Sequence, residues 1–243
     1  PQWIPTLRRL VGRGSIGTSF DVVPGWRMLG SDDRGSARYD SLWLAGADLL
    51  RRAGFRYGTV YVVHAESAHR AADLYRYFRN LDPRAGVRFN PIYLEGRAEA
   101  LDEGPITPSQ YGRFLVNLFD AWHADNRRMS VMPLGEWLAA WEGRQDRLCC
   151  DSRGSCALTH LGIAPDGRVY SCGRGIDGQE APHGNILEDP LSRILSHPAR
   201  QALVRRSEVL RSGECQDCEW WELCHGGCPH DALLGCGDSL RRT

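Results

Sequence analysis

Residues 215–228 read "CQDCEWWELCHGGC", so four cysteines fall within fourteen positions, separated by two, five and three residues. They belong to a larger set confined to the last hundred residues of the chain: Cys149, Cys150, Cys156, Cys172, Cys215, Cys218, Cys224, Cys228 and Cys236. Disulfide scaffolds are usually short secreted chains with an even number of cysteines. Nine thiols gathered at one end of a longer chain instead predict metal ligation in a reducing, cytoplasmic compartment.

The composition of the 243-residue chain is that of an ordinary globular protein, with 42% hydrophobic and 25% charged residues. The formal net charge is zero, which provides no field to attract nucleic acid or an anionic membrane. The longest strongly apolar run, at residues 59–63, is far too short to span a bilayer. We therefore expect neither nucleic acid nor a membrane as a partner. All thirty basic residues are arginine, so this chain offers no catalytic lysine.

The first 148 residues contain no cysteine and alternate between strand and helix patterns. Short β-branched and aromatic runs predict strands at 15–20, 58–63 and 87–94. Amphipathic patterns predict helices at 39–54, 67–81, from 107 to about 122, and at 134–143. This alternation predicts parallel βα units covered by helices. Three units are too few to close an eight-stranded barrel, so we expect half of a partial barrel or a small open sheet.

The helix that starts after Thr107 carries a complete start signal. Thr107 is a good N-cap, Pro108 suits the first helical position, and Gln110 completes a capping box. Its apolar residues predict one buried face, which we interpret as core packing: Tyr111, Phe114, Leu115, Leu118, Phe119 and Trp122.

After about residue 148 the sequence becomes rich in Gly, Cys and polar residues. Residues 161–172 predict a hairpin around the turn at 165–167. Residues 189–206 predict helix, capped by Asp189 with Pro190 at the first position, and His197 before Pro198 divides it in two.

Two metal chemistries compete for the cysteines. Zinc takes four ligands, commonly from two cysteine pairs, and iron–sulfur cubanes also take four thiolates. Eight of the nine cysteines would fill two four-ligand sites of either kind. The count leaves both open, and the spacing has to decide.

The spacing forms one long pattern. Cys156 is followed by ten residues, Gly167, four residues and Cys172; then come Cys215 to Cys228 and, after a second gap, Cys236. This pattern resembles the seven-cysteine signature of the SPASM domain, the C-terminal extension of many radical SAM enzymes, and covers about residues 150–236. The resemblance implies two auxiliary [4Fe–4S] clusters. The first would be held by Cys150, Cys156, Cys172 and Cys228, and the second by Cys215, Cys218, Cys224 and Cys236.

Cys228 lies in the run of cysteines assigned to the second cluster but would bind the first. It would thereby cross-link distant segments of the domain, which couples folding to metal loading. Cys149 is left over, and we expect it to be a neighbouring thiol and not a ligand.

The strand at 17–21, "GTSFD", resembles the "GVSLD" strand that opens the second half of the radical SAM barrel. This resemblance implies an α/β fold: the C-terminal half of a partial (β/α)6 barrel at residues 1–146, followed by a cysteine-rich SPASM domain at 147–243. It also implies that Ser19 and an arginine shortly after it contact S-adenosylmethionine (SAM). Arg27 is the candidate, because a guanidinium binds a carboxylate bidentately.

The sequence departs from the radical SAM pattern in one essential part. The CxxxCxxC motif that holds the third, SAM-binding [4Fe–4S] cluster is absent, and so are the first three strands of the barrel. We expect this chain to be the C-terminal part of a longer enzyme, the alternative being a protein that has lost that half. The complete enzyme would use a 5′-deoxyadenosyl radical to modify a peptide or protein side chain, with flavodoxin or ferredoxin as electron donor.

The residue after Cys172 narrows the set of reactions that the sequence favours. The sulfatase maturases that resemble this pattern carry an Asp there, which acts as a base, whereas this chain has Gly173. The sequence therefore favours crosslinking or another maturation of ribosomally made peptides over formylglycine formation. Two other functions stay open: a non-catalytic iron–sulfur electron-transfer or partner module, and a zinc-stabilised interaction domain.

Overall fold

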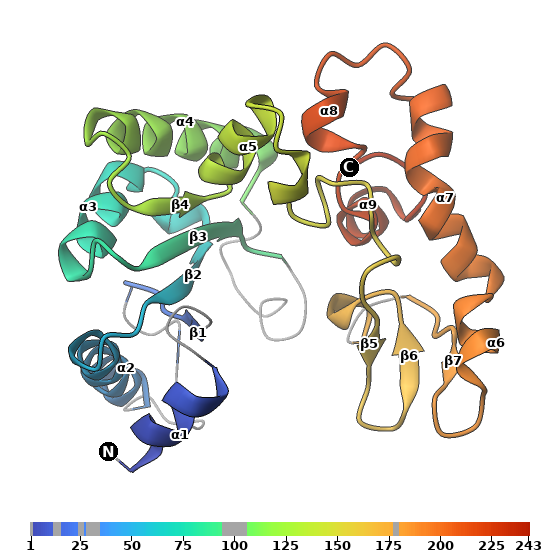
Figure 1. The fold of residues 1–243 in the computed structure, drawn as a ribbon. Helices are drawn as coiled ribbons and strands as arrows, with labels where there is room; N and C mark the ends of the chain where they lie inside the picture. Colours follow the sequence, from blue (N-terminus) through green and yellow to red (C-terminus); the bar gives the residue numbers. More distant parts are fainter. Residues whose placement is uncertain (1, 12–15, 24–26, 28–34, 94–105, 177–179) are drawn as a thin grey trace. The chain divides into compact units, whose positions relative to one another are not determined.

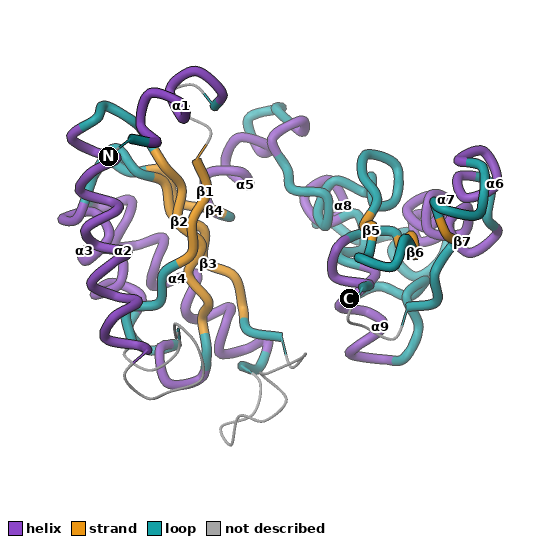
Figure 2. Tube along the Cα trace, turned by 90° about the horizontal axis from the view of Figure 1, so that it is seen from below, coloured by secondary structure: helices purple, strands orange, loops and turns teal. Residues whose placement is uncertain are grey.

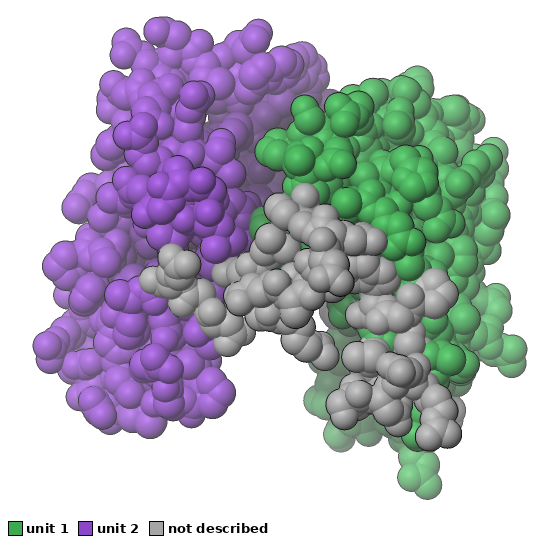
Figure 3. Space-filling view, turned by 180° about the vertical axis from the view of Figure 1, so that it is seen from behind, with its two compact units in different colours: residues 1–135 green, residues 136–243 purple. Residues whose placement is uncertain are grey.

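The computed structural model describes residues 2–11, 16–23, 27, 35–93, 106–176 and 180–243. Its internal contacts divide the chain into two compact units, residues 1–135 and 136–243 (Figure 3). The boundary predicted between residues 146 and 147 stays a prediction.

The first unit is built on a parallel sheet. After α1 (Trp3–Leu10), strands and helices alternate as β1 (Ile16–Ser19), α2 (Gly35–Arg52), β2 (Tyr57–Val63), α3 (Ala71–Leu81), β3 (Gly86–Pro91), α4 (Pro108–Ala124) and β4 (Ser130–Met132). The strand order is β1-β2-β3-β4, and all three pairings are parallel (Figure 1). The α/β fold with parallel βα units is thus confirmed.

One face of this sheet carries the helices (Figure 2). Tyr61 of β2 and Phe89 of β3 are neighbours in register and fully buried. Phe78 of α3 and Phe114 of α4 both contact the Phe89 ring, at centroid distances of 6.0 and 5.4 Å. The Trp43 indole of α2 donates a hydrogen bond to the Oγ1 atom of Thr18 in β1. These contacts place α2, α3 and α4 over the same face, where aromatic burial provides most of the core.

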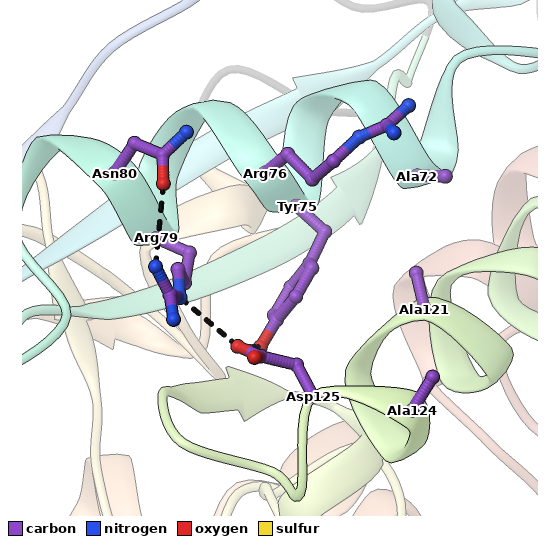
Figure 4. A pocket seen from close by; sticks show the side chains of 8 residues that line it. All are labelled: Ala72, Tyr75, Arg76, Arg79, Asn80, Ala121, Ala124 and Asp125. Carbon is purple, nitrogen blue, oxygen red and sulfur yellow. Dashed lines mark hydrogen bonds and ion pairs between the residues drawn. The ribbon is translucent and has the colours of Figure 1, made fainter.

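A polar contact joins α3 and α4 at a groove of about 440 Å³ (Figure 4). The Tyr75 hydroxyl donates to Asp125 Oδ2 at 2.9 Å, and Arg79 Nε donates to the same oxygen at 3.0 Å. Tyr75 is buried, so the bond fixes the spacing of the two helices at that point.

The structure differs from the sequence-based predictions at four places in this unit. The capping box at Thr107 and Gln110 is present, but Phe119 is 40% exposed and lies outside the buried face of α4. Residues Ala65–Ser67 form a 3₁₀ turn, so α3 starts later than expected. α1 and β4 were not predicted.

The second unit is made of short elements. β5 (Gly162–Ile163), β6 (Arg168–Tyr170) and β7 (Gly184–Asn185) form an antiparallel sheet, followed by α6 (Leu191–Leu195), α7 (Pro198–Ser212), α8 (Trp221–Cys224) and α9 (Pro229–Cys236). α5 (Leu134–Trp141) contains the boundary between the units. The predicted hairpin is present, with Gly167 at a φ of 86° in its turn.

The predicted start of the helix at 189 is wrong by one residue. Pro190 is the N-cap of α6, not its first residue. Asp189 cannot cap the helix because its carboxylate accepts the Asn185 N–H at 2.9 Å and pairs with Arg193 at 3.0 Å. The division of the helix at His197 and Pro198 is as predicted.

Within the described residues, no helix combines the length and the apolar character needed to cross a membrane.

Candidate functional site

All nine cysteines lie in the second unit as free thiols. Cys149 and Cys150 follow the 3₁₀ turn at Gln145–Arg147, and Cys172 follows β6. Cys215 and Cys218 lie in the loop between α7 and α8. Cys224 ends α8, Cys228 is the N-cap of α9, and Cys236 ends α9. The loops and helix ends of this unit therefore present the thiols.

Cys156 lies near enough to the other three cysteines predicted for the first cluster for their charges to act on one another. The pKa of Cys156 is raised to about 12, first by burial and then by the charges of Cys228 and Cys172. The pKa of Cys150 is raised by a hydrogen bond with Cys149, by burial, and by the charges of Cys149, Asp151 and Cys156. The Cys149 thiol therefore lies beside that of Cys150, and its exclusion from the ligands stays a prediction. Half-buried thiols of this kind suit thiolate ligation once a metal displaces their protons.

Two glycines fix the backbone on the approach to Cys172. A Cβ atom at Gly162 of β5 would lie 2.3 Å from the Cys172 carbonyl oxygen, so only glycine permits this approach of the two segments. At Gly167, the positive φ and a Cβ position 2.3 Å from Asn185 Oδ1 likewise require glycine. The glycine of the predicted pattern is thus explained by the turn that leads to Cys172.

Three cysteines of the second predicted group also lie together. Cys215 is buried, and it packs with Cys218, Leu210 and Trp221 in one apolar cluster. Burial raises the pKa of Cys215, and the charges of Cys218 and Cys224 act in the same direction. Cys236 is exposed, and its Sγ approaches the carbonyl oxygens of Ala232 at 3.1 Å and Asp238 at 3.7 Å. Its membership of this group stays a prediction.

In the described part of the chain, no group of three or more His, Cys, Asp or Glu side chains is arranged to hold a single metal ion. A four-iron cluster binds each of its thiolates through a different iron atom, so its ligands need not converge on one point. The donor set of the first group, four sulfurs from four separate segments, fits such a cluster chemically. The assignment of ligands stays a prediction.

The turn between Cys224 and Cys228 links the two predicted groups. His225, Gly226 and Gly227 all have positive φ angles, at 50°, 87° and 72°. The buried Arg206 of α7 donates to the carbonyl oxygens of Gly226 and Gly227, both at 2.8 Å. The turn is therefore held by a guanidinium that the sequence analysis missed. No local pattern marks Arg206, because its partners lie at least twenty positions away.

A buried polar cluster supports the residue before Cys172. Ser171 Oγ lies 2.7 Å from His183 Nε2, and Glu180 Oε1 lies 3.4 Å from the same nitrogen. Burial alone would raise the pKa of Glu180, but hydrogen bonds from His183 and Ser171 outweigh it and hold the pKa below its ordinary value.

The predicted SAM contacts lie in the first unit, at the carboxyl end of β1. Ser19 is in register with Val60, Arg88 and Met132, a row on the sheet face opposite to the helices. Arg27 Nε donates to Asp21 Oδ2 at 2.6 Å, and Asp21 also accepts the Val62 N–H. The structure thus places the Arg27 guanidinium against Asp21, two residues after Ser19. Their contact with SAM stays a prediction.

A family model described as "SPASM: Iron-sulfur cluster-binding domain" matches residues 150–228. This segment is similar to the SPASM domain. The description agrees with the iron–sulfur chemistry predicted for this part of the chain. The number of clusters and their ligands stay predictions.

Relatives extend the similarity beyond the SPASM domain into the parallel sheet. A "serine-type anaerobic sulfatase-maturating enzyme" of Bacteroides thetaiotaomicron is 26% identical over 80% of this chain and 50% of its own length. The enzyme of the same description from Klebsiella aerogenes is 29% identical over 82% and 47%. A "cysteine-type" enzyme of Clostridium perfringens is 26% identical over 75% and 49%. The chain thus spans about half the length of these curated relatives, and its recognition as a relative of radical SAM/SPASM enzymes is confirmed.

A solved structure supports the fold of both units. "Native anSMEcpe with bound AdoMet and Cp18Cys peptide" superimposes with a TM-score of 0.75 and 22% identity, covering 99% of this chain and 66% of that one. The radical SAM/SPASM fold class predicted from the sequence is therefore confirmed.

Proposed function

We propose that this chain belongs to a radical SAM/SPASM oxidoreductase that modifies a peptide or protein side chain. The observation that carries the proposal is the continuity of the similarity. It runs through the parallel βα unit and the SPASM domain together, over 75–82% of the chain, and the similar proteins are maturases of sulfatases. A SPASM domain that served only as an electron-transfer or partner module would not need the parallel sheet of a radical SAM enzyme.

The chain's own residues supply two auxiliary cluster sites. Cys150, Cys156, Cys172 and Cys228 would hold the first [4Fe–4S] cluster, and Cys215, Cys218, Cys224 and Cys236 the second. Ser19 and the terminal nitrogens of Arg27 would bind SAM, since Arg27 uses only Nε for Asp21. When bound, SAM and its own cluster would supply the radical chemistry for hydrogen abstraction from the substrate. Flavodoxin or ferredoxin is the proposed electron donor.

The position after Cys172 supports a reaction other than formylglycine formation. Gly173 carries no carboxylate to take a proton from the substrate. Packing does not impose glycine there, because a Cβ at this position meets no atom within 4 Å. We infer that the missing carboxylate reflects the chemistry, and that crosslinking or another peptide maturation is the reaction.

Metal analysis of the anaerobically purified protein tests the proposal against its rivals. We expect about eight iron and eight sulfide per chain from the two auxiliary sites, together with reductive cleavage of SAM by the full-length protein. Zinc without sulfide would establish the zinc-stabilised domain instead. Clusters without any SAM cleavage would establish the non-catalytic module.

The variant G173D tests the choice of reaction. We expect the wild-type protein to leave Ser- and Cys-containing sulfatase peptides without an aldehyde, and G173D to form hydrazine-reactive aldehyde in them. The variant G135A, also in open space, is the control for a merely structural effect. Aldehyde formed by the wild-type protein would show that Gly173 does not exclude formylglycine formation.

A further inference from the structure

One charged side chain reaches a predicted cluster ligand directly. Arg174 Nη1 donates to Cys228 Sγ at 3.4 Å, and Arg174 Nη2 donates to Asp231 Oδ1 at 2.6 Å. Both side chains of the ion pair are partly buried, with 32% and 20% of their surface exposed. The guanidinium therefore lies between a thiol sulfur and a carboxylate.

Arg174 and its two partners come from two separate segments of the second unit. Arg174 belongs to the 3₁₀ turn Gly173–Gly175, whose N-cap is Cys172. Cys228 is the N-cap of α9, and Asp231 lies in the first turn of that helix. The side chain thus starts beside one predicted ligand of the first cluster and ends at another, and Asp231 fixes its direction.

We propose that Arg174, oriented by Asp231, raises the reduction potential of the cluster at Cys150, Cys156, Cys172 and Cys228. The inference rests on the proposed function, because it requires that cluster. Each reduction adds one electron and one negative charge to the cluster. A donor and a positive charge at a ligand sulfur stabilise the more negative, reduced state. Burial of the pair limits the screening of this charge by water.

Charge removal on the two sides of the ion pair has opposite consequences. R174Q removes the positive charge beside the sulfur, so the potential of the first cluster falls. D231N keeps an acceptor oxygen for Arg174 but removes the negative charge, so the potential rises. R174K keeps the charge without the planar fork, and its potential lies between those of wild type and R174Q.

The chain provides a matched control. Arg168 and Asp166 form an ion pair of the same 2.6 Å length in the hairpin of the same domain, with both side chains about half exposed. In the described structure Arg168 Nε donates to Asp166, and no hydrogen bond from it to a sulfur is seen. R168Q and D166N should leave both cluster potentials unchanged.

The experiment is an EPR-monitored redox titration of the full-length protein with its clusters. C156S and C218S, each lacking one ligand of one site, assign the two auxiliary signals. For R174Q we expect about a tenfold change in the reduced-to-oxidised ratio at a fixed potential, which is about 59 mV for a one-electron couple, and no shift of the second cluster.

The outcomes separate this inference from the proposed function. Wild-type protein without iron and sulfide would overturn both. Loaded clusters with an unshifted first potential in R174Q, or shifts of the same sign in R174Q and D231N, would overturn the inference alone. Loss of the first cluster in both R174Q and R174K, with R168Q fully loaded, would make Arg174 a structural anchor and also overturn it.

Discussion

At the scale of single residues, the turn between Cys224 and Cys228 shows why this sequence needs two consecutive glycines. A Cβ at Gly226 would lie 2.4 Å from Leu210 Cδ1, and one at Gly227 would lie 2.7 Å from Thr243 Oγ1. Both positions also have φ angles in the left-handed region. Glycine is the residue that meets both demands at once, and the Arg206 guanidinium then reaches two carbonyls in succession.

The variant G226A should therefore destabilise the protein. The left-handed backbone costs about 1–2 kcal/mol for a residue with a Cβ, and the contact with Leu210 adds about 1–3 kcal/mol of overpacking. Urea denaturation measures the change in free energy of unfolding.

Gly235 in α9 provides the control, because it has ordinary helical φ and open space around its Cβ position. G235A should stabilise by about 0.5–1 kcal/mol. Equal effects of the two substitutions would mean that the geometry of the turn does not matter.

At the scale of elements, the contact between α3 and α4 depends on pH. The hydrogen bond from Tyr75, with the charges of Arg79 and Arg128, holds the pKa of Asp125 below its ordinary value of 3.8. A carboxyl whose pKa is lower in the folded state stabilises the protein above the unfolded pKa. That stabilisation is lost as the pH falls through the folded pKa.

We accordingly expect D125N to lower the unfolding midpoint at neutral pH, by an amount that shrinks as the pH falls below about 4. Urea denaturation of wild type and variant from pH 7 to pH 3 measures the difference. Y75F should reduce the same pH dependence, because Tyr75 is the largest cause of the shift. A difference between wild type and D125N that persists unchanged at pH 3 would contradict this account.

The elements that the sequence predicted well are those with local signals. Period-2 and period-3.6 patterns located β2, β3, α2 and α4, and the Thr107 cap is a contiguous motif. β4 has only three residues, too few to show a period, and its burial comes from pairing with β3. Asp189 has the right residue type for a cap, but its carboxylate accepts the N–H of Asn185, four positions earlier, in place of a helix N–H.

The same distinction applies to the site. The spacing of the cysteines is a property of the sequence, so the resemblance to the SPASM signature is visible in the sequence alone. The roles of Arg174 and Arg206 are not, because Arg174 meets Cys228 and Asp231 across 54 and 57 positions and Arg206 meets two carbonyls across 20 and 21. Contacts of that separation exist only once the chain has folded.

At the scale of the whole molecule, the two units differ in what holds them together. The first has a seven-residue central strand and an 18-residue helix, and its sheet buries Tyr61, Phe89 and Phe114 completely. The second has strands of two or three residues. Its cluster of Leu210, Trp221, Cys215 and Cys218 includes two predicted metal ligands. Because strands this short supply little core, we expect bound metal to contribute to the stability of this unit.

Removal of iron should therefore unfold the second unit selectively. Metal binding contributes to folding free energy when the ligands come together only in the folded state, and here the first set spans residues 150 to 228.

After anaerobic chelation, hydrogen exchange measured by mass spectrometry should show lost protection in β6 and α7. The amides of β2 and β3 should keep theirs, because their ladder is covered by a buried apolar core that contains no cysteine. C156S should reproduce the loss without chelator, and reconstitution of wild type with iron and sulfide should reverse it. Unchanged protection of α7 in the iron-free protein would mean that the apolar core is enough to keep the second unit folded. The position of Cys228 at the first site would then result from the fold, and its metal ligation would not be needed to form the fold.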